Sequence, residues 1–427
     1  MATIIAVLNI SFLAFISYRI WRKERPPLRQ FFWPALLIKL AAGVCLGWVY
    51  TYYYAVGDTF NYFDDGVKLA NLARTDVGSY VNFLWSGDDS FPVWSELLYQ
   101  QPRAMFLSKI TSLFCLLTSD NYWIISLHFS SITFYCSWLL VKKIIDLYKP
   151  FTVGAIIGFL FFPSVVFWSS GIIKESIAMA SLFFLSYLVI KVWKKDAITI
   201  WEWLLALLSV WLIWNLKYYY IAIFLPVVFT TLLTKAILAR FPVRHIALKV
   251  TMWAFIFILP LSLVSLLHPN FYPERFMEVV VSSYNEFKSI SAPEDVIQYA
   301  SLEPTPLSML KNMPKALFSG LFRPFFTEAK TALQFFIAFE NLILLMLTLA
   351  TFAQLKKLIN HKYRILFLSI LVYTFLLCTF LALSTPNFGT LSRYRVGFLP
   401  FLVFVLTIEN PLINKLMTLK IFGNLVR

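Results

Sequence analysis

Long, unbroken runs of apolar residues recur along the whole chain of 427 residues. Most of these runs reach roughly 18 residues or more, the length at which an apolar helix can cross a bilayer. The strands of a membrane barrel would instead alternate apolar and polar residues over about ten positions. The pattern therefore predicts an all-α polytopic membrane protein.

The apolar lengths predict about eleven transmembrane helices, in a single membrane domain that covers 1–427. The predicted spans are 2–18, 31–54, 121–141, 151–168, 175–193, 199–215, 219–238, 247–267, 332–355, 363–383 and 397–412. Residues 104–119 are too short for an easy crossing and contain Lys109. We expect them to form an interfacial or re-entrant helix instead.

Lysine and arginine gather in the short loops on one side of the predicted membrane, which marks those loops as cytoplasmic. This orientation places two long loops, 55–120 and 268–331, on the other side. We expect the first loop to contain amphipathic helices, and both loops to fold against the spans.

Composition supports the membrane assignment. Hydrophobic residues make up 59% of the chain and charged residues 14%, whereas soluble domains carry about 25% charged residues. The net charge of +15 fits basic cytoplasmic loops, and no soluble basic module points to nucleic acid. The 4 cysteines and 4 histidines show no ligand spacing, so no metal-binding residue is predicted, although a divalent cation stays open.

An acidic cluster follows the second predicted span, in the stretch "YYYAVGDTFNYFDDG". Asp58, Asn61 and Asp65 are spaced i, i+3, i+7 and would share one helix face. Gly57 permits a sharp break, so Asp58 is predicted to cap the helix that follows. The carboxylate could serve only as that cap, or as an acceptor-activating base or metal-binding carboxylate at the membrane surface. Asp64 is the weaker candidate.

Two cationic positions interrupt apolar runs at the same outer face. Lys174 and Glu175 follow the helix breakers in "FFPSVVFWSSGIIKES", and Lys217 lies in "WNLKYYY". Each lysine could be an interface anchor, or a cation that holds a lipid phosphate.

Two arginines, Arg393 and Arg395, precede the last predicted span on the outer side, against the usual bias of basic residues toward the cytoplasm. Because the guanidinium fork binds phosphate oxygens in a bidentate way, these residues predict a phosphate or pyrophosphate site. Arg323 and Glu340 are predicted to support it. A glutamate in a span costs a few kcal/mol unless it is paired, so Glu340 should have a cationic partner.

An acid cluster and several cations on one face suit an enzyme that acts on a lipid-linked anion. The order of motifs resembles the GT-C superfamily of polyprenyl-phosphate-sugar-dependent membrane glycosyltransferases, in particular the bacterial protein mannosyltransferase and aminoarabinose transferase branch. "GDTFNYFDDG" resembles its acidic motif, "QPRAMFLSKITSLFCLLTSDNYW" its proline-led amphipathic helix, and "FFPSVVFWSSGIIKES" and "WNLKYYY" its two hairpins.

The resemblance implies a GT-C-like fold and a bacterial inner-membrane glycosyltransferase of cell-envelope polysaccharide biosynthesis, with its active site facing outward. Asp58 would match the catalytic acid, with Asp65 as a helper. Glu175 would match a distal acidic residue and Lys217 the family's lysine. The donor would be a polyprenyl-phosphate-linked sugar, and the acceptor a glycan, lipid or protein. Lys174 and Arg323 have no clear counterpart in that family.

Two alternatives stay open. The ending "NFGTLSRYRVGFLP" also resembles O-antigen polymerase-like proteins, which act on lipid-pyrophosphate-linked repeat units. A lipid-linked glycan transporter or flippase would carry charges near the membrane midplane and often repeated halves. Lys39 and Glu340 are the main charges inside the predicted spans, and no repeat is visible.

Overall fold

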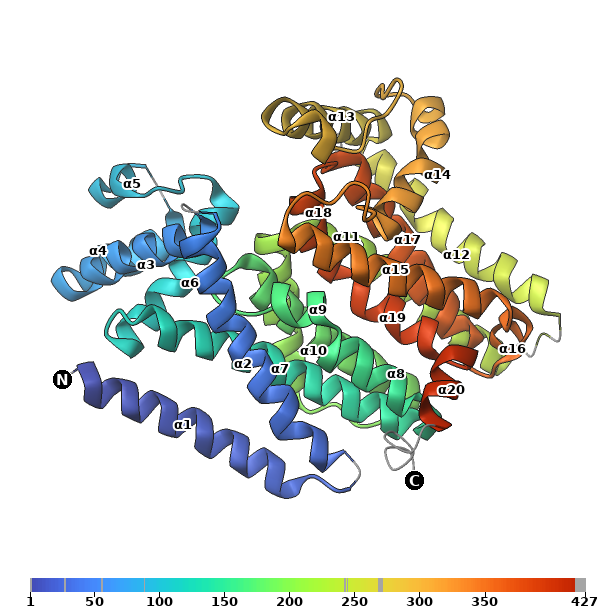
Figure 1. Ribbon diagram of the computed structural model, residues 1–427, viewed down its shortest axis with the longest axis horizontal. Coiled ribbons are helices and arrows are strands. Elements are labelled where there is room, and N and C mark those ends of the chain that lie inside the picture. Colours follow the sequence, from blue (N-terminus) through green and yellow to red (C-terminus); the bar gives the residue numbers. More distant parts are fainter. Residues whose placement is uncertain are drawn as a thin grey trace. The chain divides into compact units, whose positions relative to one another are not determined.

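The computed structural model describes residues 2–26, 28–54, 57–87, 89–241, 243, 245–267 and 272–418. Within these ranges the secondary structure is helical (Figure 1), and one isolated antiparallel bridge joins Val296 to Asn387. The predicted all-α class is therefore confirmed at the level of secondary structure.

Seven helices in the described part of the chain are long and apolar enough to cross a membrane. They are α1 (Ala2–Lys23), α2 (Arg29–Tyr52), α7 (Tyr122–Leu147), α10 (Lys174–Lys194), α11 (Ile200–Arg240), α15 (Ala332–Phe352) and α17 (Arg364–Ser384). A pair bent by 67°, Phe388–Gly397 with Leu399–Thr407, would raise the number to eight. An integral membrane protein is supported, but the predicted number of eleven spans is not confirmed.

The predicted span 151–168 is not one continuous helix. It is divided into α8 (Thr152–Ile156), a π-helical turn at Ile157–Phe161 and α9 (Pro163–Trp168). Pro163 lacks a backbone N–H, and Phe162 before it is extended with φ −65° and ψ 119°. The proline therefore ends one helical segment and begins the next.

Two other predicted spans, 199–215 and 219–238, fall within the single element α11. Its backbone leaves helical geometry at Lys217, with φ −146° and ψ 62°. The break predicted between these two spans is thus at the right place, but it is a kink inside one helical element and not a loop between two helices. The predicted span 247–267 corresponds to α12 (Ile246–Leu267).

Internal contacts divide the chain into two compact units, one ending at Ile221 and the other starting at Ala222 within α11. Each unit is described by itself below. Nothing in this division tests the prediction that 1–427 forms one membrane domain, which stays a prediction.

The first unit has α2, α7 and α10 packed side by side (Figure 1). Phe32 of α2 is fully buried, and its ring lies 5.2 Å from Phe134 and 4.8 Å from Trp138 of α7. Gly171, just before α10, has φ +70°, and its N–H donates to Ser130 Oγ at 3.0 Å. The backbone before α10 is therefore fixed against α7.

The first predicted outer loop is mostly helical, as expected. It contains α3 (Asp58–Thr75), α4 (Val77–Ser86), α5 (Pro92–Glu96) and α6 (Pro102–Thr118). α3 packs closely on α6. The two helices approach so closely at Gly66 that a Cβ there would lie 2.9 Å from Thr111 Cγ2. With 17 residues, α6 is not among the candidate spans. Its interfacial position stays a prediction.

The second unit contains the remaining helices, with α17 packed against α14 and α19 (Figure 1). Besides those already named, they are α13 (Pro273–Ile290), α14 (Pro306–Phe322), α16 (Leu355–Asn360), α18 (Phe388–Tyr394), α19 (Leu399–Thr407) and α20 (Pro411–Thr418). The N–H of Ile297 donates to Pro386 O at 3.0 Å, and Tyr299 Oη donates to Ala382 O at 3.0 Å. These bonds fix the second long loop to the end of α17. Part of that loop, 268–271, lies outside the described residues.

Candidate functional site

Asp58 is the first residue of α3 and is half-buried. The N-cap is Gly57, whose backbone is extended, so the prediction that Asp58 is the cap was wrong by one residue. A side chain at Gly57 would collide with Tyr50, because its Cβ would lie 2.0 Å from a ring carbon. Close packing under the tyrosine ring thus puts glycine at the cap and the carboxylate in the first turn, where the helix dipole stabilises a negative charge.

Tyr99 holds the Asp58 carboxylate. Its hydroxyl donates to Asp58 Oδ1 at 2.6 Å and accepts from Asn61 Nδ2 at 3.3 Å. Asp58 and Asn61 therefore lie on the same face of α3, as their spacing predicts. The short bond to a phenol orients the carboxylate and stabilises its charge.

Asp65 is fully buried and holds the segment that carries Tyr99. Its two carboxylate oxygens accept from the N–H groups of Leu98 at 2.8 Å and Tyr99 at 3.0 Å. Lys68 Nζ lies 3.6 Å from Oδ1. This geometry favours a positioning role for Asp65, and its predicted catalytic role stays a prediction. Asp64 is exposed on another face.

Lys174 begins α10, as the sequence predicts, and is half-buried. Its ammonium stands over the ring of Tyr62, 5.6 Å from the centroid. The Tyr62 ring also packs on Tyr99, with centroids 4.8 Å apart. Tyr62 thus connects Lys174 to Tyr99, the residue that holds Asp58, and a cation over an aromatic face is stabilised there.

Lys217 and Glu175 form a buried ion pair in the first unit. Lys217 Nζ lies 2.7 Å from Glu175 Oε1, and the side chains are 4% and 0% exposed. The sequence assigned these residues to two separate motifs, and the structure brings them together. The ammonium of Lys217 already has an anionic partner, so its predicted binding of a phosphate stays a prediction.

Lys39, the charge inside α2, is 6% exposed. Its ammonium donates to Val166 O at 3.2 Å and to Ser169 Oγ, at the end of α9. Among the described residues it has no carboxylate partner. The last carbonyls of a helix lack internal donors and attract cations, so Lys39 has a structural explanation as the C-terminal cap of α9.

In the second unit, Arg395 is 3% exposed and is held by neutral groups. Nη1 donates to Asn341 Oδ1 at 2.7 Å, and Nη2 donates to Leu321 O at 3.0 Å. Nε has no hydrogen-bond partner among the described residues. Glu340 of α15 is 4% exposed, and its expected cationic partner stays a prediction.

The other two arginines of the second unit differ in their surroundings. Arg393 is 8% exposed near the end of α18. Arg323 is engaged by Glu328: its Nε donates to Oε1 at 2.8 Å, and its guanidinium lies 4.9 Å from the Phe388 ring centroid. Burial alone would raise the pKa of Glu328, but the hydrogen bonds from Arg323 and the N–H of Phe325 lower it overall.

The candidate residues therefore gather in two groups. The first unit contains Asp58, Asp65, Lys174, Glu175 and Lys217, and the second contains Arg323, Glu340, Arg393 and Arg395. Sequence analysis missed Tyr99, which lies 41 positions from Asp58 in a polar segment without periodicity. Its aromatic side chain between two short helices was the only local signal.

No group of three or more His, Cys, Asp or Glu side chains in the described ranges is placed to hold a metal ion. No protein-family model, curated protein or solved structure matches this chain.

Proposed function

We propose that this protein is a membrane glycosyltransferase of GT-C type, which moves a sugar from a polyprenyl-phosphate donor to a glycan, lipid or protein acceptor on the non-cytoplasmic face. The observation that carries the proposal is the half-buried carboxylate of Asp58, oriented by Tyr99 and connected through Tyr62 to the cation of Lys174. A positioned base, together with a cation connected to it through two tyrosine rings, suits displacement of a phosphate leaving group.

In the proposed reaction an acceptor hydroxyl oxygen attacks the anomeric carbon of the donor sugar. The bond between that carbon and the phosphate oxygen breaks, and the lipid phosphate leaves with the electron pair. Asp58 accepts the proton of the attacking hydroxyl. Lys174 stabilises the negative charge on the departing phosphate. Because the lipid phosphate carries the donor sugar, the reaction needs no nucleotide.

The proposed topology has the site on the outer side and eleven crossings. In it α11 crosses twice, because a straight helix of 41 residues would be about 60 Å long, twice the roughly 30 Å of hydrocarbon. The break at Lys217 supports this division. Cysteine labelling at position 58 that occurs only from the cytoplasm would contradict the orientation.

The test replaces Asp58 with Asn in the full chain and measures sugar transfer from a polyprenyl-phosphate donor in proteoliposomes. We expect the rate to fall by roughly 10²–10⁴-fold, the usual contribution of a general base. Asp64→Asn is the matched control, because Asp64 is exposed on the same helix and should keep full activity. Full activity of Asp58→Asn, or flipping of the donor without a glycosidic product, would exclude the proposal.

A second candidate is an enzyme that joins lipid-pyrophosphate-linked repeat units. The observation in its favour is Arg395, whose buried guanidinium is hydrogen-bonded only to the neutral groups Asn341 and Leu321 among the described residues. Such a cation keeps its attraction for a pyrophosphate. Chain elongation that requires Arg395 but tolerates Asp58→Asn would favour this candidate over the first.

A further inference from the structure

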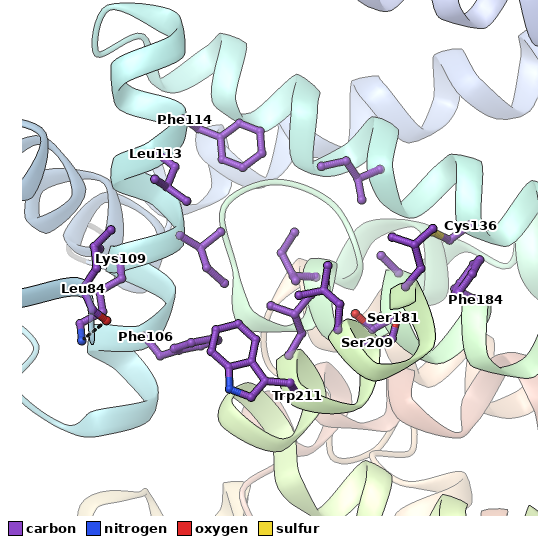
Figure 2. Close-up of a pocket in the computed structure, with 17 residues that line it drawn as sticks. Leu84, Phe106, Lys109, Leu113, Phe114, Cys136, Ser181, Phe184, Ser209 and Trp211 are labelled. Atoms are coloured by element: carbon purple, nitrogen blue, oxygen red, sulfur yellow. Dashed lines mark hydrogen bonds between the residues drawn. The ribbon is translucent and has the colours of Figure 1, made fainter. Parts of the chain in front are cut away.

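The first unit contains an apolar pocket of about 460 Å³. Its walls come from α6, α7, α10 and α11, with Leu84 of α4 at one side (Figure 2). The volume is within the range of roughly 300–1,000 Å³ that is typical of small-molecule sites. The candidate catalytic residues Asp58, Tyr99 and Lys174 do not line it, so the pocket is a separate feature.

An apolar pocket in a membrane protein needs an apolar occupant, because an empty space forfeits dispersion contacts with its lining. Phe106 and Trp211 form part of the wall with ring centroids 4.9 Å apart. Lipid acyl chains are as apolar as this lining, so the transfer of a chain from the bilayer into the pocket does little by itself to distinguish one lipid from another. Selectivity must come from a polar group at one end.

Lys109 is that group, and it is the one ionisable lysine, arginine or acid among the lining residues. Figure 2 shows it with Leu84 on one side of the pocket, while Cys136 and Phe184 lie on the opposite side. Its ammonium donates to Leu84 O at 3.0 Å and stands 5.2 Å from the Phe83 ring centroid.

The ammonium has capacity left for a ligand. It carries three donor hydrogens, and its hydrogen bond within the described residues goes to a carbonyl oxygen, that of Leu84. None of the described carboxylates forms an ion pair with it. Close packing fixes its position, since a Cβ at Gly87 would lie 2.8 Å from Lys109 Nζ. Partial burial lowers the pKa of Lys109, and an anion beside it would counter that effect.

We propose that the pocket holds one hydrocarbon chain of an anionic bilayer phospholipid, with the phosphate of its headgroup against Lys109. The single cation at one end and the apolar lining elsewhere match the division of such a lipid into head and tail. A phospholipid is also the most abundant amphiphile around the protein, so mass action favours it over a rarer carrier lipid. The proposal does not depend on the proposed function.

The test is native mass spectrometry of the full chain after exchange into micelles that contain phosphatidylglycerol, phosphatidylcholine or a polyprenyl phosphate. We expect one phosphatidylglycerol per chain, retained about tenfold better than phosphatidylcholine, because the choline cation of phosphatidylcholine offsets its phosphate charge and repels the ammonium of Lys109. Lys109→Met should abolish this preference, and Ala180→Trp, which fills the pocket, should remove the bound lipid.

Two controls make the result decisive. Leu117→Trp introduces the same tryptophan at an exposed position of α6, and Lys315→Met removes an exposed lysine of α14; both should keep the lipid and the preference. Equal retention of phosphatidylglycerol and phosphatidylcholine would overturn the proposal. So would lipid retained by Ala180→Trp at the wild-type level, or a polyprenyl phosphate retained in preference to phosphatidylglycerol.

Discussion

The two units of the chain each bury a cation, but they balance its charge in different ways. In the first unit Lys217 meets the carboxylate of Glu175 at 2.7 Å. In the second unit Arg395 donates to the amide of Asn341 and to the carbonyl of Leu321. The first arrangement puts a carboxylate in contact with the ammonium, whereas the second satisfies the guanidinium with hydrogen bonds to neutral groups.

This difference has a consequence for anion binding. A buried ion pair must be broken before its cation can neutralise a new anion, and removing one partner leaves the other charge exposed to a low dielectric. A cation held by dipoles needs no such exchange. Lys217 is thus suited to stability, and Arg395 to attraction of an anion.

The largest expected effect comes from breaking the ion pair of the first unit. Lys217→Met should lower the free energy of unfolding by about 3–5 kcal/mol, because Glu175 is left buried without its cation. Reversible unfolding in mixed micelles measures it. The double variant Lys217→Met with Glu175→Gln should recover much of the loss. Additive losses in the double variant would show that the pair is not coupled.

A substitution in the backbone segment before α10 is a second way to disturb the ion pair of Lys217 and Glu175. Gly171→Ala should cost about 2 kcal/mol, because φ is +70° and an alanine there is strained. The new Cβ would also lie 2.8 Å from Leu46 Cδ2. Gly78→Ala, whose Cβ meets only Asp76 Oδ1 at 3.3 Å, is the control. Equal melting temperatures for the two variants would contradict this account.

A substitution in the second unit is expected to lower the free energy of unfolding by a smaller amount. Arg395→Met removes two hydrogen bonds to neutral acceptors but also relieves a buried charge, so the net cost should be about 1–2 kcal/mol. The same unfolding experiment measures it. A loss as large as that of Lys217→Met would remove the contrast between the two cations.

The smallest effect is a pH dependence of the pair between Arg323 and Glu328. The pKa of Glu328 lies below its ordinary value of 4.5, so the folded state binds this proton less readily than the unfolded chain. The stabilisation is present above that ordinary value and is lost as the pH falls through the lower folded pKa. Melting temperatures measured between about pH 6 and 3 should show this loss.

Glu328→Gln should flatten that part of the pH profile. The control is Glu294→Gln: the pKa of Glu294 is also lowered, by a hydrogen bond from Lys330, but both side chains are about half exposed. Solvent screens that pair, so the variant should keep the wild-type profile. An unchanged profile in Glu328→Gln would show that other acids control it.

Much of the local structure could be predicted from the sequence. The face shared by Asp58, Asn61 and Asp65 was predicted from helical spacing, and the break at Lys217 between two predicted spans was also predicted. The cap at Asp58 was misplaced by one residue because the packing of Gly57 under Tyr50 is a tertiary contact. The eleven spans were counted from apolar length alone, which cannot reveal that 151–168 is divided into short helices.

The sequence by itself determined the class of protein, because span length, hydropathy and helical period are properties of neighbouring residues. It also identified the acids and cations that deserved testing. Only the tertiary structure decided their partners: Tyr99 for Asp58, Glu175 for Lys217 and Asn341 for Arg395. The physical reason is that burial and hydrogen bonding depend on residues far apart in the chain, and these contacts decide which charges are cancelled.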